Sequence, residues 1–226
     1  MLLSFESRPR RVRVVVPRDV EEHPPVLVLF DGQNVLGDHG SHAGGWHAHA
    51  AIERLPGTIR KPVLVAVDHG HHHRIRELWD DLDPLLVFVV EKALTEAESF
   101  VGRRFDPSKR VIGGASMGGL ASLAALARRP HDFRGALAMS PSAWLVPQSI
   151  SRELRHARLG RGTRVYVDAG LRESERMVHN AAHAAHLLEA RLEPGHLMWR
   201  PDRRGKHREA DWRRRLPKAL KFLFRR

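Results

Sequence analysis

Ser116 lies in a sequence pattern that could turn its hydroxyl group into a nucleophile. The segment Gly-Gly-Ala-Ser-Met-Gly-Gly places glycines at positions 114 and 118, which fits the G-x-S-x-G pattern of a nucleophile elbow. Arg110-Val-Ile112 precedes it and an Ala- and Leu-rich run at 120–128 follows it, as expected of a short buried strand and a helix. Small neighbours let such a strand and helix pass close together. The alternative is a glycine-rich turn that only packs.

A serine hydroxyl is a weak nucleophile at neutral pH and needs a neighbouring base, normally a histidine. The chain has 16 histidines, so position must choose among them. In α/β sheets with this motif, catalytic groups follow the carboxyl ends of strands in the order serine, acid, histidine. His207 follows the last apolar run, at 197–200, in a glycine-containing loop. We therefore predict His207 as the base, the alternative being a surface histidine in a basic loop.

The acidic partner should follow the expected strand from Arg164 to Asp168, where three carboxylates are candidates. They are Asp168, Glu173 and Glu175. Asp168 could instead cap a turn, and either glutamate could complement the positive end of the next helix. We favour Glu173, because residues 170–172 give a loop long enough to reach the histidine. The acid would hold the imidazole tautomer and stabilise the imidazolium ion.

Two backbone amides are candidates for an oxyanion hole. The amide of Met117 directly follows the serine, at a helix start where N–H groups are free to bind an anion. A second donor should come from the Asp-Gly-Gln-Asn loop at 31–34, which ends the apolar run 26–30. There we predict the amide of Gln33, and one such donor is worth about 10² to 10³ in rate. The alternative for this loop is an ordinary β-turn.

Residues near the predicted site could also bind substrate or a metal. Trp46, Trp144 and Asn34 are the predicted substrate-binding residues, with core packing as the alternative for both tryptophans. Four histidines gather at 69–73, but no carboxylate pair completes a recognisable metal shell. We therefore expect no metal site and no cofactor.

Composition limits the other functions that the chain could have. The absence of cysteine excludes disulfides, thiolate catalysis and cysteine-ligated zinc. The formal net charge of +12 could attract nucleic acid, anionic lipid or an acidic substrate. Aromatic residues are only 6% and no nucleic-acid-binding motif accompanies the basic residues, so we expect a solvated basic surface and no nucleic-acid partner. We find no apolar run of about 18 residues, so we expect no membrane span and a soluble, cytoplasmic protein.

Apolar runs alternate with helix-like segments along most of the chain. Strands are expected at 11–16, 26–30, 62–67, 110–112, 135–140, 163–168 and 197–200. Helices are expected at 46–55, 85–101, 120–128, 149–159, 173–191 and 210–224. This alternation predicts an α/β fold, with a mainly parallel sheet covered by helices on both faces. We expect a single domain over residues 1–226.

Several segments together resemble a known family. They are Phe30-Asp-Gly-Gln-Asn34, Gly113-Gly-Ala-Ser-Met-Gly-Gly-Leu120, Met139-Ser-Pro-Ser-Ala-Trp144, Tyr166-Val-Asp-Ala-Gly-Leu-Arg-Glu173 and Gly205-Lys-His-Arg-Glu-Ala-Asp-Trp212. The chain is similar to the putative-esterase branch of the α/β-hydrolases. This branch includes enterochelin esterases, feruloyl esterases, esterase D-like enzymes and mycolyltransferases. The family often has asparagine after the catalytic histidine, where this chain has Arg208.

The resemblance implies a serine esterase acting on a small-molecule ester through an acyl-enzyme. It implies Ser116 as nucleophile and His207 as base, with the amides of Gln33 and Met117 as the oxyanion hole. Two alternatives remain at this stage: acyl transfer to an acceptor other than water by the same residues, and a non-catalytic protein of this fold that binds anionic partners. Neither the natural substrate nor the oligomeric state follows from the sequence.

Overall fold

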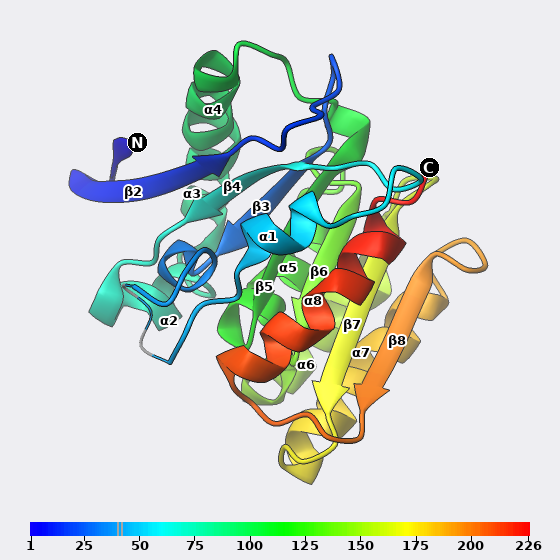
Figure 1. The fold of residues 1–226 in the computed structure, drawn as a ribbon. Helices are drawn as coiled ribbons and strands as arrows, with labels where there is room; N and C mark the ends of the chain where they lie inside the picture. Colours follow the sequence, from blue (N-terminus) through cyan, green and yellow to red (C-terminus); the bar gives the residue numbers. More distant parts are fainter. Residues whose placement is uncertain (40, 42) are drawn as a thin grey trace.

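The computed structural model describes residues 1–39, 41 and 43–226. One eight-stranded sheet runs through it in the order β1-β2-β4-β3-β5-β6-β7-β8 (Figure 1). The strands are β1 Leu2–Phe5, β2 Arg8–Val15, β3 Val26–Phe30, β4 Val63–Val67, β5 Arg110–Ala115, β6 Gly135–Met139, β7 Arg164–Gly170 and β8 Leu197–Asp202. β3 to β8 are parallel to one another, and β1 and β2 form an antiparallel edge.

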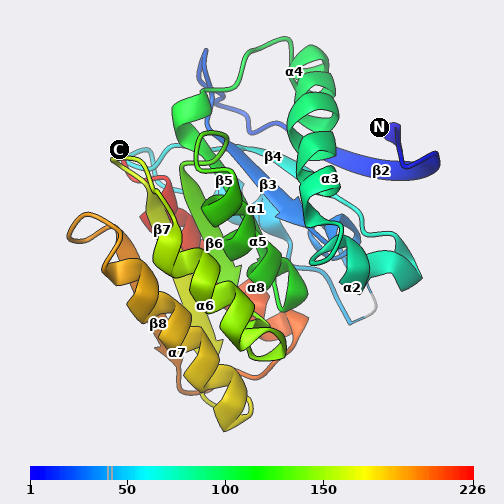
Figure 2. The same cartoon turned by 180° about the vertical axis from the view of Figure 1, so that it is seen from behind.

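Helices cover both faces of the sheet. They are α1 Ala48–Glu53, α2 Arg74–Glu77, α3 Leu82–Val87, α4 Leu94–Val101, α5 Met117–Arg128, α6 Pro147–His156, α7 Glu175–Glu189 and α8 Glu209–Leu223. α1 and α8 lie on the face turned to the viewer in Figure 1, and α4 to α7 lie on the face seen in Figure 2. A π-helical segment, Phe88–Ala93, joins α3 to α4.

The apolar runs become strands because both of their faces are covered. Every residue of β3 and β4 is buried, as in parallel strands between two helical layers. Along β3, Val28 and Phe30 pack into the core under α5, whereas Leu27 and Leu29 pack into the core under α8. The alternating side chains therefore supply two cores from one short strand.

The predicted α/β fold, mainly parallel with helices on both faces, is confirmed. Several predicted boundaries differ from the structure, and two of the differences have a clear physical reason. β1 is absent from the expected strands, because its hairpin to β2 turns on Glu6 and Ser7, which have positive φ angles of 48° and 61° without a glycine. The helix expected from position 173 begins at Glu175 instead, because Ser174 caps it by accepting the N–H of Met177.

No helix in the described part of the chain is long and apolar enough to cross a lipid bilayer.

The turn from β5 into α5 depends on two glycines that touch. A Cβ atom placed on Gly114 would lie 2.6 Å from the backbone carbon of Gly118, closer than packed atoms tolerate. Between them Ser116 has φ 56° and ψ −119°, a region that costs of order 1–3 kcal/mol for a residue with a side chain. The close approach of strand and helix thus forces a strained serine between them.

We expect Gly114→Ala to lower the free energy of unfolding by about 1–3 kcal/mol, because the added methyl group meets backbone that cannot move aside. Gly57→Ala is the matched control, since a Cβ there meets nothing within 4 Å. We expect that control to leave stability unchanged or to raise it slightly. Urea unfolding of the two variants checks this, and equal midpoints would contradict the steric argument.

Candidate active site

Ser116, His207 and Glu173 meet at one edge of the sheet. The Oγ of Ser116 lies 2.9 Å from Nε2 of His207, and Nδ1 of His207 lies 3.2 Å from Oε2 of Glu173. The three residues follow the carboxyl ends of β5, β7 and β8. The structure therefore brings together, within hydrogen-bonding distance, the three residues that the sequence proposed as nucleophile, base and acid.

The loops that carry Glu173 and His207 are tied to each other. A Cβ atom on Gly170 would lie 2.3 Å from the carbonyl oxygen of Gly205, so both positions need a residue without a side chain. The N–H of Arg172 donates to that carbonyl at 3.0 Å, and the N–H of Leu171 donates to the carbonyl of Asp202 at 2.8 Å. These contacts hold the loop after β7 against the loop after β8, which sets the distance between carboxylate and imidazole.

Glu173 is buried and fully supplied with hydrogen-bond donors. Its side chain is 1% exposed, and its Oε1 accepts the hydroxyl of Ser140 at 2.6 Å and the N–H of Gly170 at 2.9 Å. Burial opposes ionisation, but the hydrogen bonds from His207, Ser140 and Gly170 outweigh it and hold the pKa of Glu173 below its usual value. The carboxylate is therefore ionised at neutral pH beside the imidazole.

The two rival carboxylates lie elsewhere. Asp168 is fully buried, where it accepts the N–H of Ser140 at 2.9 Å and the hydroxyl of Tyr166 at 3.1 Å. Burial raises the pKa of Asp168 to about 6, although Arg215 and these donors favour its charged form. Glu175 is the first residue of α7 and is exposed. Of the three candidates, Glu173 is the one that contacts His207.

Ser140 joins the acid to helix α8. Its hydroxyl donates to Glu173 and accepts Nε1 of Trp212 at 3.1 Å and Nη2 of Arg215 at 2.9 Å. The ring of Trp212 also meets the His207 ring edge to face, with centroids 5.0 Å apart. Trp212 and Arg215 are three residues apart on the buried face of α8, so both can reach the site from one helix.

These supporting residues were missing from the sequence-based site. Ser142 was missed as well, and its Oγ lies 3.1 Å from the Oγ of Ser116. The signal available for both serines is the Ser-Pro-Ser sequence at the carboxyl end of β6, the strand next to β5. A polar pair at that position of a parallel sheet lies where ligands bind.

The two amides predicted for the oxyanion hole occupy the expected elements. Met117 begins α5, and the first N–H groups of a helix have no partner within it. Gln33 lies in a short 3-10 helix, Gly32–Asn34, directly after β3. The side chain of Gln33 accepts the N–H of His69 at 3.2 Å. Asp31, before this turn, has a φ of 58° and forms a two-pronged ion pair with Arg74 at 2.6 and 2.7 Å.

The predicted substrate-binding residues differ in their surroundings. Trp46 is 2% exposed and packs in the α8 core, with its ring 6.1 Å from that of Trp212, which matches core packing. Trp144 is half-buried, with the guanidinium of Arg176 5.2 Å from its ring centroid. The amide of Asn34 lies 3.4 Å from the carboxylate of Glu209.

The histidines at 69–73 lie at the end of β4, where residues 71–73 form a 3-10 helix. The described ranges, 1–39, 41 and 43–226, contain no group of three or more histidine, aspartate or glutamate side chains placed to hold a metal ion.

Comparison with known proteins places the chain in a family. A family model described as "Putative esterase" matches residues 98–223, more than half of the chain. The iron(III) salmochelin esterase of Escherichia coli is 28% identical over 155 residues, which cover 65% of this chain and 35% of that protein. The match thus spans about a third of the length of that relative.

Solved structures share the fold. The BES protein of Bacillus cereus superposes with a TM-score of 0.83 at 17% identity, covering 99% of this chain and 93% of that one. The enterobactin esterase FES of Shigella flexneri gives a TM-score of 0.79 at 22% identity, covering 99% of this chain and 58% of that one. The fold is that of the α/β-hydrolases. The chain belongs to the Putative esterase family.

The raised pKa of Asp168 makes a prediction for stability. Because the folded protein binds this proton more tightly than the unfolded chain does, the contribution of Asp168 is present near pH 4 and lost as pH rises through about 6. We therefore expect wild type to lose on the order of 2 kcal/mol of unfolding free energy relative to Asp168→Asn between pH 4.5 and 7. Urea unfolding of both proteins at the two pH values measures this. A difference that stays constant would contradict the shift.

Proposed function

We propose that this chain is a serine esterase that hydrolyses a carboxylic ester through an acyl-enzyme. The observation that carries the proposal is the continuous path from Ser116 Oγ through His207 to the buried Glu173, at 2.9 and 3.2 Å. A hydroxyl within hydrogen-bonding distance of an imidazole, which is itself oriented by a carboxylate, is the arrangement that activates a serine.

In the proposed cycle, Ser116 attacks the ester carbonyl while His207 takes its proton. The oxyanion is stabilised by the amides of Met117 and Gln33, which lie at the starts of α5 and of the 3-10 helix after β3. His207 then protonates the departing alcohol, and water attacks the acyl-enzyme with the same histidine as base. Glu173 keeps Nδ1 of His207 protonated, so that Nε2 faces the serine.

The surroundings of Ser116 support a small organic ester as the substrate. Leu145 and Leu171 are 45% and 46% exposed, and they follow β6 and β7 at the same edge of the sheet as the serine. Exposed leucines at the edge of the sheet that carries the nucleophile can bind an apolar part of the substrate. The related proteins named for salmochelin and enterobactin esters make such esters a first choice in a substrate screen.

Covalent labelling tests the nucleophile directly. We expect a fluorophosphonate to add one phosphonyl group with loss of fluoride, because the activated Oγ of Ser116 attacks phosphorus. Intact-mass and peptide mass spectrometry locate the group. We expect Ser116→Ala to take up no label and to lose hydrolysis of short p-nitrophenyl esters. Ser108→Ala is the control, since Ser108 lies at the amino end of β5. Full activity of Ser116→Ala would overturn the proposal.

A second substitution tests the acid. We expect Glu173→Gln to lower kcat on p-nitrophenyl acetate at least about 100-fold, because glutamine cannot stabilise the imidazolium ion. Glu175→Gln, two residues away and exposed, should stay within about twofold of wild type. Steady-state kinetics of the two variants decides between them. A larger loss of kcat in Glu175→Gln would instead identify Glu175 as the acid.

A further inference from the structure

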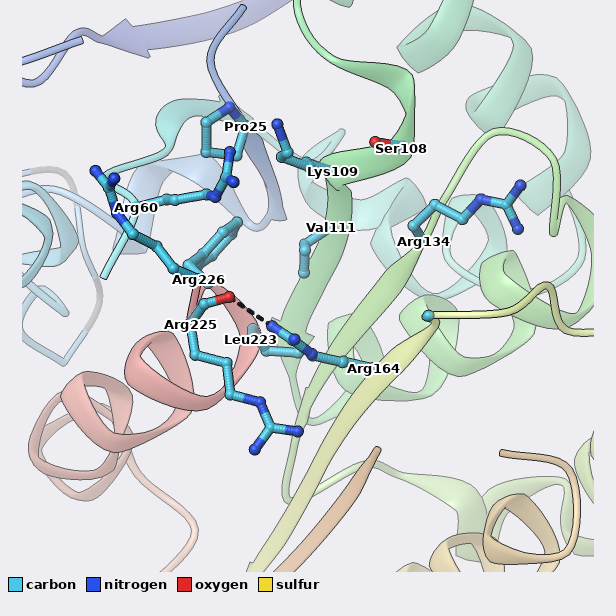
Figure 3. Close-up of a pocket in the computed structure, with 12 residues that line it drawn as sticks. Pro25, Arg60, Ser108, Lys109, Val111, Arg134, Arg164, Leu223, Arg225 and Arg226 are labelled. Atoms are coloured by element: carbon cyan, nitrogen blue, oxygen red, sulfur yellow. Dashed lines mark hydrogen bonds between the residues drawn. The ribbon is translucent and has the colours of Figure 1, made fainter. Parts of the chain in front are cut away.

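A cavity of about 260 Å³ lies at the end of the sheet opposite Ser116 (Figure 3). Its walls come from the segments that precede β3, β5 and β6, from the start of β7, and from the end of α8. Lys109, which lines the cavity, directly precedes β5, and Ser116 directly follows it. Six strand residues separate the two ends by about 20 Å. The cavity is therefore separate from the candidate active site.

The cavity is lined by six cationic side chains and by no aspartate or glutamate side chain. The cations are Arg60, Lys109, Arg134, Arg164, Arg225 and Arg226. Lys109 pairs with Asp106, while Arg60 and Arg226 share Glu21. Within the described part of the chain, the other three have no carboxylate within 4 Å. The cavity therefore carries an excess of positive charge that the protein itself does not neutralise.

Among these cations, Arg164 has a buried nitrogen without a partner in the described part of the chain. One of its terminal nitrogens, Nη1, donates to the carbonyl of Arg225 at 2.7 Å, but its Nε is buried and finds no partner among the described residues. Burial, together with the nearby charges of Arg225 and Arg60, lowers the pKa of Arg164. A desolvated guanidinium beside other cations is unfavourable. An anion in the cavity would relieve this repulsion.

Apart from Ser108 and Gly162, the remaining residues of the cavity wall are apolar. Pro25, Val111, Leu223 and Phe224 line it, and all four are buried. Figure 3 shows Val111 and Leu223 together with Arg164 among the residues that line the cavity. The volume falls just below the roughly 300–1,000 Å³ typical of sites for drug-sized ligands. The chemistry therefore fits a compact molecule that has an anionic head and an apolar body.

We propose that this cavity binds a small organic oxyanion, a carboxylate or a phosphate monoester on an apolar group, with Arg164 as its anchor. The guanidinium donates to the head in a charge-assisted hydrogen bond, which is about twice as strong as a neutral one. Arg60 and Arg225 supply the surrounding positive potential. The apolar body lies on Val111 and Leu223. The proposal is independent of ester hydrolysis at Ser116.

Titration calorimetry on the full chain at about 20 mM salt tests this with phenyl phosphate, benzoate, inorganic phosphate and phenol. We expect one of the two aryl anions to bind one to one. Phenol lacks the anionic head and inorganic phosphate lacks the apolar body, so each should bind at least tenfold more weakly. Whichever of phenyl phosphate and benzoate binds with the higher affinity shows whether the cavity prefers a phosphate monoester or a carboxylate.

We expect Arg164→Gln to weaken binding of the preferred aryl anion at least tenfold. Arg11→Gln is the matched control, because Arg11 is exposed on β2 and its loss changes the net charge equally. It should bind as wild type does. If Arg164→Gln fails to fold, Arg225→Gln, an exposed wall residue, should weaken binding several-fold instead. Equal losses in the wall variant and Arg11→Gln, equal binding of phenol, or no binding of either anion would overturn the proposal.

Discussion

The contact between Gly114 and Gly118 decides where the serine hydroxyl can be. It leaves Ser116 at φ 56°, and backbone hydrogen bonds to the segment at the end of β6 help to hold it there. Its N–H donates to the carbonyl of Met139 at 2.9 Å, and its carbonyl accepts the N–H of Ser142 at 3.0 Å. Met139 ends β6, and Ser142 lies three residues beyond it. A strained residue persists only where its surroundings over-determine it, so the end of β6 is part of the elbow.

The same segment also fixes the acid. A hydroxyl group has one proton and two lone pairs. Ser140 gives its proton to Glu173, and both lone pairs are taken by Trp212 and Arg215. The direction of each hydrogen bond is thereby set, and Glu173 is always the acceptor of the Ser140 proton. Ser140 itself has a positive φ of 42°, so strain is again used to aim a side chain into the site.

The sequence was sufficient to predict the residues whose order along the chain is set by the fold. Ser116, Glu173 and His207 each follow an apolar run, in the order that this fold requires. Ser140 escaped notice because its partners lie 33, 72 and 75 residues away, and no local spacing signals such a contact. The sequence could not decide whether Trp46 lines a pocket or packs in the core, because its partner Trp212 comes from α8 at the far end of the chain.

Charge balance explains why a buried aspartate that does not touch His207 can still matter. Arg215 lies 3.3 Å from Asp168 and 4.0 Å from Glu173, and all three side chains are at most 4% exposed. With Asp168 and Glu173 both ionised at neutral pH, two carboxylates face one guanidinium, and the cluster carries one net negative charge. When His207 takes the serine proton in the proposed cycle, its imidazolium ion neutralises that charge. Because burial strengthens such interactions, the cluster favours the state in which the proton has moved to the histidine.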